Sequence, residues 1–160
     1  MRSGGVMSLS EDRFSEGSFS ENSFSENTVL EQLRQRSQLG LPAHMQLEPV
    51  CAAPGALTLQ LAIQPFHLAP NGYLHAATIV ALADTACGFG CIANLPPGAV
   101  NFTTVELKTN FLRTATDGVI ACEATLMHGG KRTQIWDATV YDADRNVMAL
   151  FRCTQMLLYT

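Results

Sequence analysis

A long apolar stretch with a single acid at its centre is the feature that most constrains how this chain can fold. Asp84 is the only formally charged residue between Glu48 and Glu106, and it lies in the middle of the apolar segment 74–94. Removing an ionised carboxylate from water is costly unless partners stabilise it. Asp84 is therefore a candidate functional residue, although composition alone leaves open that its carboxylate reaches solvent or caps a neighbouring element.

The same stretch is about as long as a bilayer requires, so a membrane span competes with a buried helix. The acid at its centre, His75 near its start and the lack of a flanking Lys or Arg argue against a span. A helix that is apolar on all sides is equally explained by burial within a sheet. We therefore expect a helix over about residues 74–94, wrapped by strands, and no membrane partner.

Composition narrows the class of protein further. A length of 160 residues suggests one domain with a substantial core. The net charge is −4 and no basic run occurs, so a nucleic-acid partner is not expected. The first residues lack the apolar core of a signal peptide. The five cysteines are odd in number and form no Cys-x-x-Cys pair, which fits reduced thiols and a cytoplasmic location.

The first 27 residues differ from the rest. A Phe-Ser-Glu unit repeats with a period of five from Phe14 onward, which matches neither the helical nor the strand period. We predict a disordered low-complexity tail over 1–27 and a single domain over 28–160. Thr28 and Glu31 have the spacing of a capping box, which predicts a short helix that ends at Gly40 and Pro42.

Alternating apolar and polar residues predict a series of strands. The alternation runs from 57 to 63 and again from 103 to 112, as in strands with one buried face. Further strands are expected over 119–127, 133–141 and 147–159. Turn compositions at 116–118, 128–130 and 142–146 predict hairpins between neighbouring strands. Two strands, one long buried helix and a meander give an α+β fold with an antiparallel sheet wrapped around the helix.

Several kinds of chemistry are excluded by absence. No serine occurs beyond Ser37 and no glycine-rich phosphate loop is present. A serine triad within the strand and helix region that follows Ser37 and a nucleotide loop are therefore ruled out. The histidines are His44, His67, His75 and His128. They lack metal-site spacing, so no metal is expected, and no organic cofactor is expected either. The Cys87-x-x-x-Cys91 pair is interpreted as core packing.

The start of the predicted helix is a second candidate site. Asn71-Gly72 is a turn signal, after which the first-turn N–H groups of the helix have no backbone partner. Such a terminus can polarise a carbonyl oxygen. Asp84 lies nine residues beyond His75, which is roughly 13 Å along the axis and about half a turn around it. One helix cannot bring both to one substrate atom, whereas two antiparallel helices in a two-fold dimer could.

These residues resemble a known family. Asn71-Gly72-x-x-His75, two small residues and then the run Ala-Leu-Ala-Asp-Thr-Ala at 81–86 resemble the hotdog-fold acyl-CoA thioesterases, in the branch of the phenylacetate-degradation and 4-hydroxybenzoyl-CoA thioesterases. The likeness covers about residues 45–159, including the strand 104–113. It implies a hotdog fold, a homodimer or dimer of dimers (homotetramer), and sites at the dimer interface.

The resemblance also implies roles for individual residues. Asp84 would act as nucleophile or as general base for water, and Ala76 would offer its N–H to the thioester oxygen. Asn71 falls near a polar residue that orients substrate or water. Thr104 falls where relatives place a Ser or Thr beside the acid.

One departure from the family pattern concerns the helix start. The family usually reads His-Gly-Gly, whereas this chain reads His75-Ala76-Ala77. The two methyl groups could hinder the approach of the thioester to the backbone or reshape the pocket. Alanine keeps the N–H and favours the helix, so activity is expected to survive.

Basic residues are scarce, which makes the few of them candidates for binding the phosphates of coenzyme A. Arg113 and the turn that carries Lys131 and Arg132 combine cations with turn N–H groups, which suits such anions. Each of these residues can equally be solvated surface charge.

The sequence therefore predicts a hydrolase that cleaves acyl-CoA thioesters to free acid and CoA. Two alternatives stay open at this point: a hydratase or dehydratase of the same fold, which would use a His and an acid as a proton-transfer pair, and a non-catalytic acyl-CoA-binding module.

Overall fold

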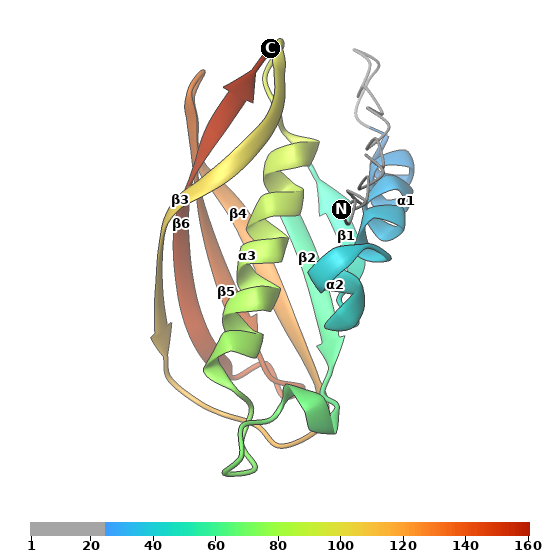
Figure 1. Ribbon diagram of the computed structural model, residues 1–160, viewed down its shortest axis with the longest axis vertical. Coiled ribbons are helices and arrows are strands. Elements are labelled where there is room, and N and C mark those ends of the chain that lie inside the picture. The colour runs from blue at the N-terminus through green and yellow to red at the C-terminus, as the bar shows by residue number, and fades with distance from the viewer. Residues whose placement is uncertain (1–24) are drawn as a thin grey trace, which may run out of the picture.

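The computed structural model of the protein describes residues 25–160 and places one long helix inside a curved sheet (Figure 1). The helices are α1 (Glu26–Ser37), α2 (Gly40–His44) and α3 (Ala76–Ala93), with a short 3-10 turn, η1 (Pro65–His67), before α3. The strands are β1 (Glu48–Ala53), β2 (Ala56–Ala62), β3 (Ala99–Phe111), β4 (Val119–Gly129), β5 (Thr133–Tyr141) and β6 (Val147–Tyr159). They form one antiparallel sheet in the order β1-β2-β4-β5-β6-β3.

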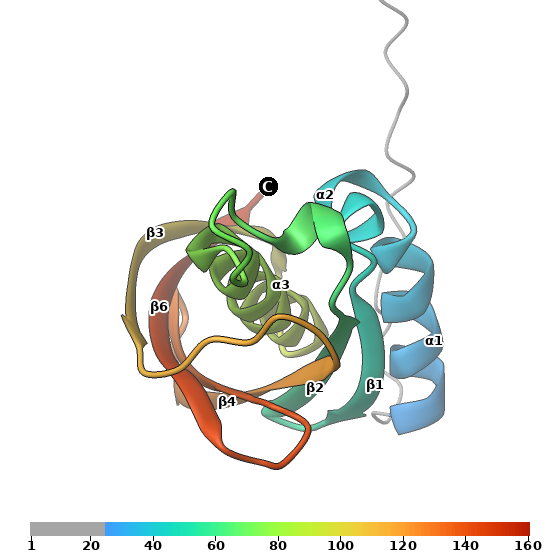
Figure 2. The same cartoon turned by 90° about the horizontal axis from the view of Figure 1, so that it is seen from below.

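α3 is the centre of the domain. It contacts every strand from β2 to β6, and the end-on view in Figure 2 shows the sheet curving around it. By length and mean hydropathy (1.7) α3 could also cross a bilayer, but 56% of it is buried inside the fold, as for the core helix of a globular domain. The predicted helix over 74–94 is confirmed with slightly shorter bounds, and so is the α+β architecture with an antiparallel sheet.

The predicted meander is correct for three strands and wrong for the fourth. Hairpins join β4 to β5 and β5 to β6, as the turn compositions indicate. β3, however, pairs with β6 and not with β4, so the turn at 116–118 connects strands that are not neighbours. β3 is therefore an edge of the sheet (Figure 1). The other edge, β1, is packed against α1.

The N-terminal helix begins earlier than the sequence predicts. α1 starts at Glu26 with Ser25 as its N-cap, so the capping box at Thr28 is not formed and residues 26 and 27 do not belong to a tail. Gly40 and Pro42 lie inside a second short helix, α2, rather than ending the first. Residues 1–24 of the predicted tail lie outside the described residues. Leu33 is fully buried and joins α1 to the core.

A glycine in α3 allows the helix to approach the sheet closely. A Cβ at Gly90 would lie 2.6 Å from the ring of Trp136, which is fully buried and donates its Nε1–H to Gln134. The fixed indole cannot move aside.

We therefore expect Gly90→Ala to destabilise the fold by about 1–3 kcal/mol through overpacking, although the same change at an exposed helix position stabilises by up to about 1 kcal/mol. Thermal unfolding measures the effect. Gly88→Ala is the matched comparison and should cost less, because its Cβ would meet Phe102, which is only partly buried and can turn. Equal or higher stability of the Gly90 variant would contradict the packing argument.

Candidate active site

The start of α3 is held by a short-range hydrogen-bond network. The backbone carbonyl of His67 accepts from the His75 N–H (3.0 Å) and from the Thr78 hydroxyl (2.9 Å). His67 itself is buried, with Nδ1 accepting from Gln64 N–H and Nε2 lying 3.1 Å from the Met45 carbonyl oxygen. Burial lowers the pKa of His67, so this histidine is a neutral structural residue.

His75 caps the start of α3. Its Nδ1 accepts a hydrogen bond from the Ala77 N–H at 2.9 Å, and its carbonyl oxygen accepts from the Thr78 N–H at 2.9 Å. Two of the first-turn N–H groups that the sequence predicts to be unpaired are therefore occupied. The N–H of Ala76 has no acceptor within residues 25–160, and Ala76 is exposed. One backbone donor at the helix start is thus available to a ligand.

Alanine in place of glycine does not strain this helix start. Among the described non-glycine residues only Gln46 and Arg145 have positive φ values, so Ala76 and Ala77 have backbone conformations open to any residue. The turn before them is formed by Asn71, whose side-chain oxygen accepts from the Tyr73 N–H at 3.2 Å, and by Gly72 at φ +84°. Asn71 is exposed beside the helix start.

Asp84 lies in the middle of α3 and points to β3. It is partly buried, and the Thr104 hydroxyl lies 3.3 Å from its Oδ1. Burial raises the pKa of the Asp84 carboxyl above its ordinary value of 3.8, and the Thr104 contact partly offsets this. A carboxyl with a raised pKa is a better proton acceptor than an exposed aspartate. The predicted proximity of Asp84 and Thr104 is observed.

The inner face of β3 extends apolar surface away from Asp84. Leu107 is paired with Cys153 and Phe111 with Ala149, two buried residues that face α3. Leu107 and Phe111 are nevertheless 41% and 47% exposed. Between them, the buried Thr109 hydroxyl has no hydrogen-bond partner in the described part of the chain. No sequence signal separated these residues from ordinary strand core.

The basic residues predicted to bind the phosphates of coenzyme A lie at opposite ends of the sheet. The Arg113 N–H bonds to the Met148 carbonyl at the start of β6, whereas the Arg132 carbonyl accepts from the Leu157 N–H near its end. Nine residues of strand separate these points, about 30 Å. Within one subunit, Arg113 and Arg132 cannot bind the same phosphate.

Lys131 and Arg132 line a hollow of about 450 Å³ together with Pro96, Pro97 and Tyr159. The Tyr159 hydroxyl donates to the Lys131 carbonyl. Neither cation forms an ion pair within residues 25–160. Arg113, in contrast, lies close enough to Asp142 to help hold the pKa of that carboxyl low, an effect to which hydrogen bonds from Asn146 contribute most.

Comparison with known proteins agrees with this geometry. The family model of the thioesterase superfamily matches residues 71–149, which include the α3 start, Asp84 and Thr104. A Pasteurella multocida protein, PM0788, is 30% identical over 129 residues, 78% of this chain and 89% of that one. The chain belongs to the thioesterase superfamily. The 1,4-dihydroxy-2-naphthoyl-CoA hydrolase of Listeria monocytogenes is 29% identical over 116 residues, 72% of this chain and 94% of that protein.

The fold of this thioesterase has solved counterparts. A mutant of the thioesterase PA1618 of Pseudomonas aeruginosa superposes with a TM-score of 0.77 at 21% identity, covering 82% of this chain and 94% of that one. The helix within a six-stranded antiparallel sheet is the hotdog fold. Both the fold and the family expected from the sequence resemblance are confirmed, and thioester hydrolysis is the general activity that follows from them.

The other reactive side chains of this thioesterase are buried or dispersed. All five cysteines lie in the described residues and none is in a disulfide; only Cys51 is exposed. The contact with Cys153 and burial raise the pKa of the Cys87 thiol well above its ordinary value, which makes Cys87 a poor nucleophile. Within residues 25–160 no three His, Cys, Asp or Glu side chains are grouped to hold a metal ion.

The raised pKa of Asp84 has a consequence for the stability of this thioesterase. A folded-state pKa above the unfolded value means that the folded protein binds more protons in the window between the two. The favourable contribution of the neutral carboxyl is complete below the ordinary value near 3.8 and is lost as the pH rises through the folded pKa.

We therefore expect Asp84→Asn to raise the melting temperature at pH 7, with a gain that shrinks as the pH falls toward 4, because the neutral amide removes the cost of the buried charge. Thermal unfolding at a series of pH values measures this. The exposed Asp144 gives the matched control, and Asp144→Asn should change the melting temperature little. A lower melting temperature of Asp84→Asn at pH 7 would contradict the assignment.

Proposed function

We propose that this thioesterase hydrolyses acyl-CoA thioesters to free acid and CoA, with Asp84 as general base for water or as nucleophile. The observation that carries the proposal is the partly buried Asp84 carboxyl, raised in pKa and contacted by Thr104. The first residue of the same helix, Ala76, is exposed, and its N–H has no partner within residues 25–160. These two features correspond to the base and the oxyanion donor that acyl transfer to water requires. The CoA-thioester hydrolase among its relatives supports the substrate class.

The reaction with Asp84 as base uses few protein groups. The carboxylate takes a proton from water as the water oxygen attacks the thioester carbonyl carbon. The negative charge that develops on the carbonyl oxygen is stabilised by the N–H of Ala76 and the positive end of α3. Collapse of the tetrahedral intermediate breaks the carbon–sulfur bond, and the proton held by Asp84 passes to the departing CoA thiolate.

We further propose that the working unit is a homodimer, alone or within a dimer of dimers. Eight residues separate Ala76 from Asp84 on one helix, about 12 Å along the axis, so one chain does not bring both to the same carbonyl. β3 is a 13-residue edge strand with Val105, Leu107 and Phe111 exposed, and such an edge favours pairing with another strand. Antiparallel pairing of two β3 strands would set two α3 helices antiparallel.

The acyl group and the CoA phosphates are proposed to occupy different regions. Leu107 and Phe111 offer apolar surface for the acyl group along β3, leading away from the Asp84–Thr104 contact. The hollow at Lys131 and Arg132 offers two cations that form no ion pair within residues 25–160, whereas Arg113 lies beside the Asp142 carboxylate. We propose the hollow as the phosphate site. We also propose a cytoplasmic location, which suits five free cysteines.

Substitutions of the two arginines test the phosphate site. We expect Arg132→Ala to raise KM for acyl-CoA about tenfold with kcat little changed, since a charge-assisted contact is lost in both ground and transition states. Arg113→Ala is the matched control and should leave KM within about twofold of the unsubstituted protein. The reverse ranking of the two KM values would move the phosphate site to Arg113.

A thiol-release assay over aromatic, short, medium and long saturated acyl-CoA substrates tests the proposed reaction. Release of CoA from a saturated substrate supports hydrolysis, because a hydratase has no double bond to act on. Tight binding without thiol release for every substrate would reject hydrolysis and favour a binding module. The acyl chain with the highest kcat/KM defines the substrate group.

A further inference from the structure

A buried glutamine, Gln155, contacts the Thr104 hydroxyl that also contacts Asp84. Gln155 has 0% of its surface exposed and lies on the inner face of β6, directly opposite Thr104 on β3. Its Oε1 is 3.0 Å from the Thr104 hydroxyl oxygen, and its Nε2 is 3.3 Å from the Cys153 sulfur. The Thr104 hydroxyl is therefore within reach of two acceptors, Gln155 and the Asp84 carboxyl.

A hydroxyl has one proton, so Thr104 can donate to only one of them at a time. If Thr104 donates to Gln155, its lone pairs face Asp84, an arrangement that suits a protonated carboxyl that donates to Thr104. If the side-chain amide of Gln155 is reversed, Nε2–H donates to Thr104 and Thr104 donates to an ionised Asp84. The two amide orientations differ only in which terminal atom is oxygen and which is nitrogen.

We propose that Gln155 is a positioning residue whose amide reverses when Asp84 gains or loses its proton, so that Thr104 accepts from the acid in one state and donates to the carboxylate in the other. No bond between heavy atoms changes. Cys153 suits both states, since its sulfur can accept from Nε2 and its S–H can donate to Oε1. The proposal rests on the proposed role of Asp84 and adds a reason why one carboxyl can serve as base and then as acid.

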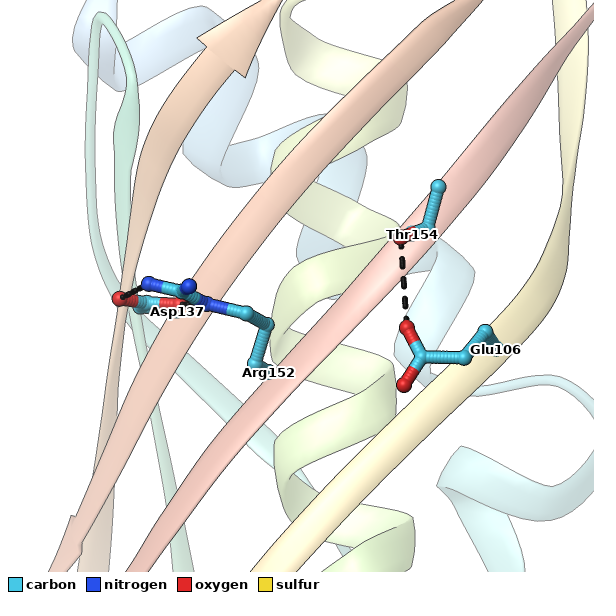
Figure 3. Close-up of polar contacts among 4 residues, drawn as sticks. All are labelled: Glu106, Asp137, Arg152 and Thr154. Carbon is cyan, nitrogen blue, oxygen red and sulfur yellow. Dashed lines mark hydrogen bonds and ion pairs between the residues drawn. The ribbon is translucent and has the colours of Figure 1, made fainter.

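Few other ionisable groups can contribute to this coupling. Cys87 lies one turn beyond Asp84 on α3 and contacts Cys153 on β6, and its pKa is raised well above its ordinary value. Glu106 lies two residues after Thr104 on β3, but its carboxylate accepts a hydrogen bond from the Thr154 hydroxyl on the outer face of the sheet (Figure 3). Asp137 and Arg152 form an ion pair on that same outer face (Figure 3). The group that changes charge beside Gln155 is therefore Asp84.

The neighbouring strand supplies a matched control. Gln134 pairs with Gln155 across β5 and β6 and is almost as buried, at 1% exposure. Its amide bonds instead to the Asn94 carbonyl at 2.7 Å and to Trp136 Nε1–H at 2.8 Å. A purely structural buried glutamine should behave like Gln134, whereas a positioning residue coupled to Asp84 should respond to the protonation of its carboxyl.

Nuclear magnetic resonance of the full chain tests the coupling without any substrate. We expect the side-chain amide resonances of Gln155 to shift with pH with the same midpoint as the Asp84 carboxyl carbon. The shift should disappear in Asp84→Asn, and the Gln134 resonances should stay constant. Gln155 resonances that do not follow Asp84, or that shift equally in Asp84→Asn, would overturn the proposal. This measurement uses proteins whose side-chain shape at the site is preserved.

Kinetics provide the second measurement. Gln155→Met should lower kcat about tenfold with little change in KM, because ionised Asp84 loses an aligned donor, whereas Gln134→Met should lower stability and leave kcat within about threefold. Thr104→Ser should retain activity, whereas Thr104→Val should lower kcat by at least about tenfold. In the Thr104→Val background Gln155→Met should have almost no further effect on kcat. A tenfold loss of kcat in that background as well would overturn the proposal that Gln155 acts through Thr104.

The two hypotheses fail in distinguishable ways. Full turnover of Asp84→Asn would reject Asp84 as the base. The pH titration of the Gln155 amide resonances in the unsubstituted protein would still show whether Gln155 follows the protonation of Asp84. An inactive Asp84→Asn variant, together with Gln155 resonances that do not shift with pH, would reject only the proposed reversal of the Gln155 amide.

Discussion

We expect Asp84→Asn to lower kcat by about 10²- to 10⁴-fold, the usual contribution of a positioned general base or acid. The asparagine keeps the size of the side chain and can still accept from Thr104, so the loss isolates basicity. If Asp84 is the nucleophile, asparagine also removes the attacking oxygen, and the loss should be at least as large. Steady-state thiol release measures kcat, and calorimetric titration with an acyl-CoA measures binding, which should be retained.

The control for this variant is its fold. Its melting temperature at pH 7 should be no lower than that of the unsubstituted protein, because the variant removes a buried charge that burial disfavours. A folded variant with kcat within about threefold of the unsubstituted protein would remove Asp84 from the mechanism.

The helix and its acid could be predicted from the sequence because their signals are local. An uninterrupted apolar stretch, the Asn71-Gly72 turn and a lone acid define α3 to within two residues at each end. The Thr104 position followed from the family resemblance and is observed beside Asp84. The capping role of His75 was not predicted, since a histidine is not among the preferred N-cap residues.

The pairing of β3 could not be predicted because it is non-local. Turn composition at 116–118 indicates that the chain reverses, but it does not say which strand becomes the neighbour. Closure of the sheet around α3 decides this, and it brings β3 beside the last strand of the chain. The opposite positions of Arg113 and Arg132 depend on the same long-range arrangement.

Gln155 was missed, although a signal was present. It has the same alternation parity as Phe151, Cys153 and Leu157, which all face the core. A polar residue at an inward position of a strand requires a partner. Only the three-dimensional contact identifies that partner as the residue that also touches Asp84.

The structure makes Ala76→Pro a suitable probe of the proposed oxyanion donor. Ala76 is the first residue of α3, the helical position where proline is best tolerated. His75 before it has φ −69° and ψ 136°, the extended conformation that a residue preceding proline adopts. The substitution should therefore remove the N–H with little effect on the fold, and Ala76→Gly, which keeps the N–H, is its matched control.

A mixture of two inactive variants tests whether the site is shared between subunits. If Ala76 of one chain works with Asp84 of the other, a dimer of one Asp84→Asn chain and one Ala76→Pro chain contains one site with both defects and one with neither. Random pairing makes half of the dimers mixed, so activity should return to about a quarter of the unsubstituted level.

Co-expression with two different affinity tags allows mixed dimers to be isolated. The isolated mixed dimers should have about half of the unsubstituted activity. Pairing Asp84→Asn with a chain that carries both substitutions should restore nothing, because no Asp84 remains. Isolated mixed dimers without activity would show that each site is built within one subunit, and the proposed interface site would have to be withdrawn.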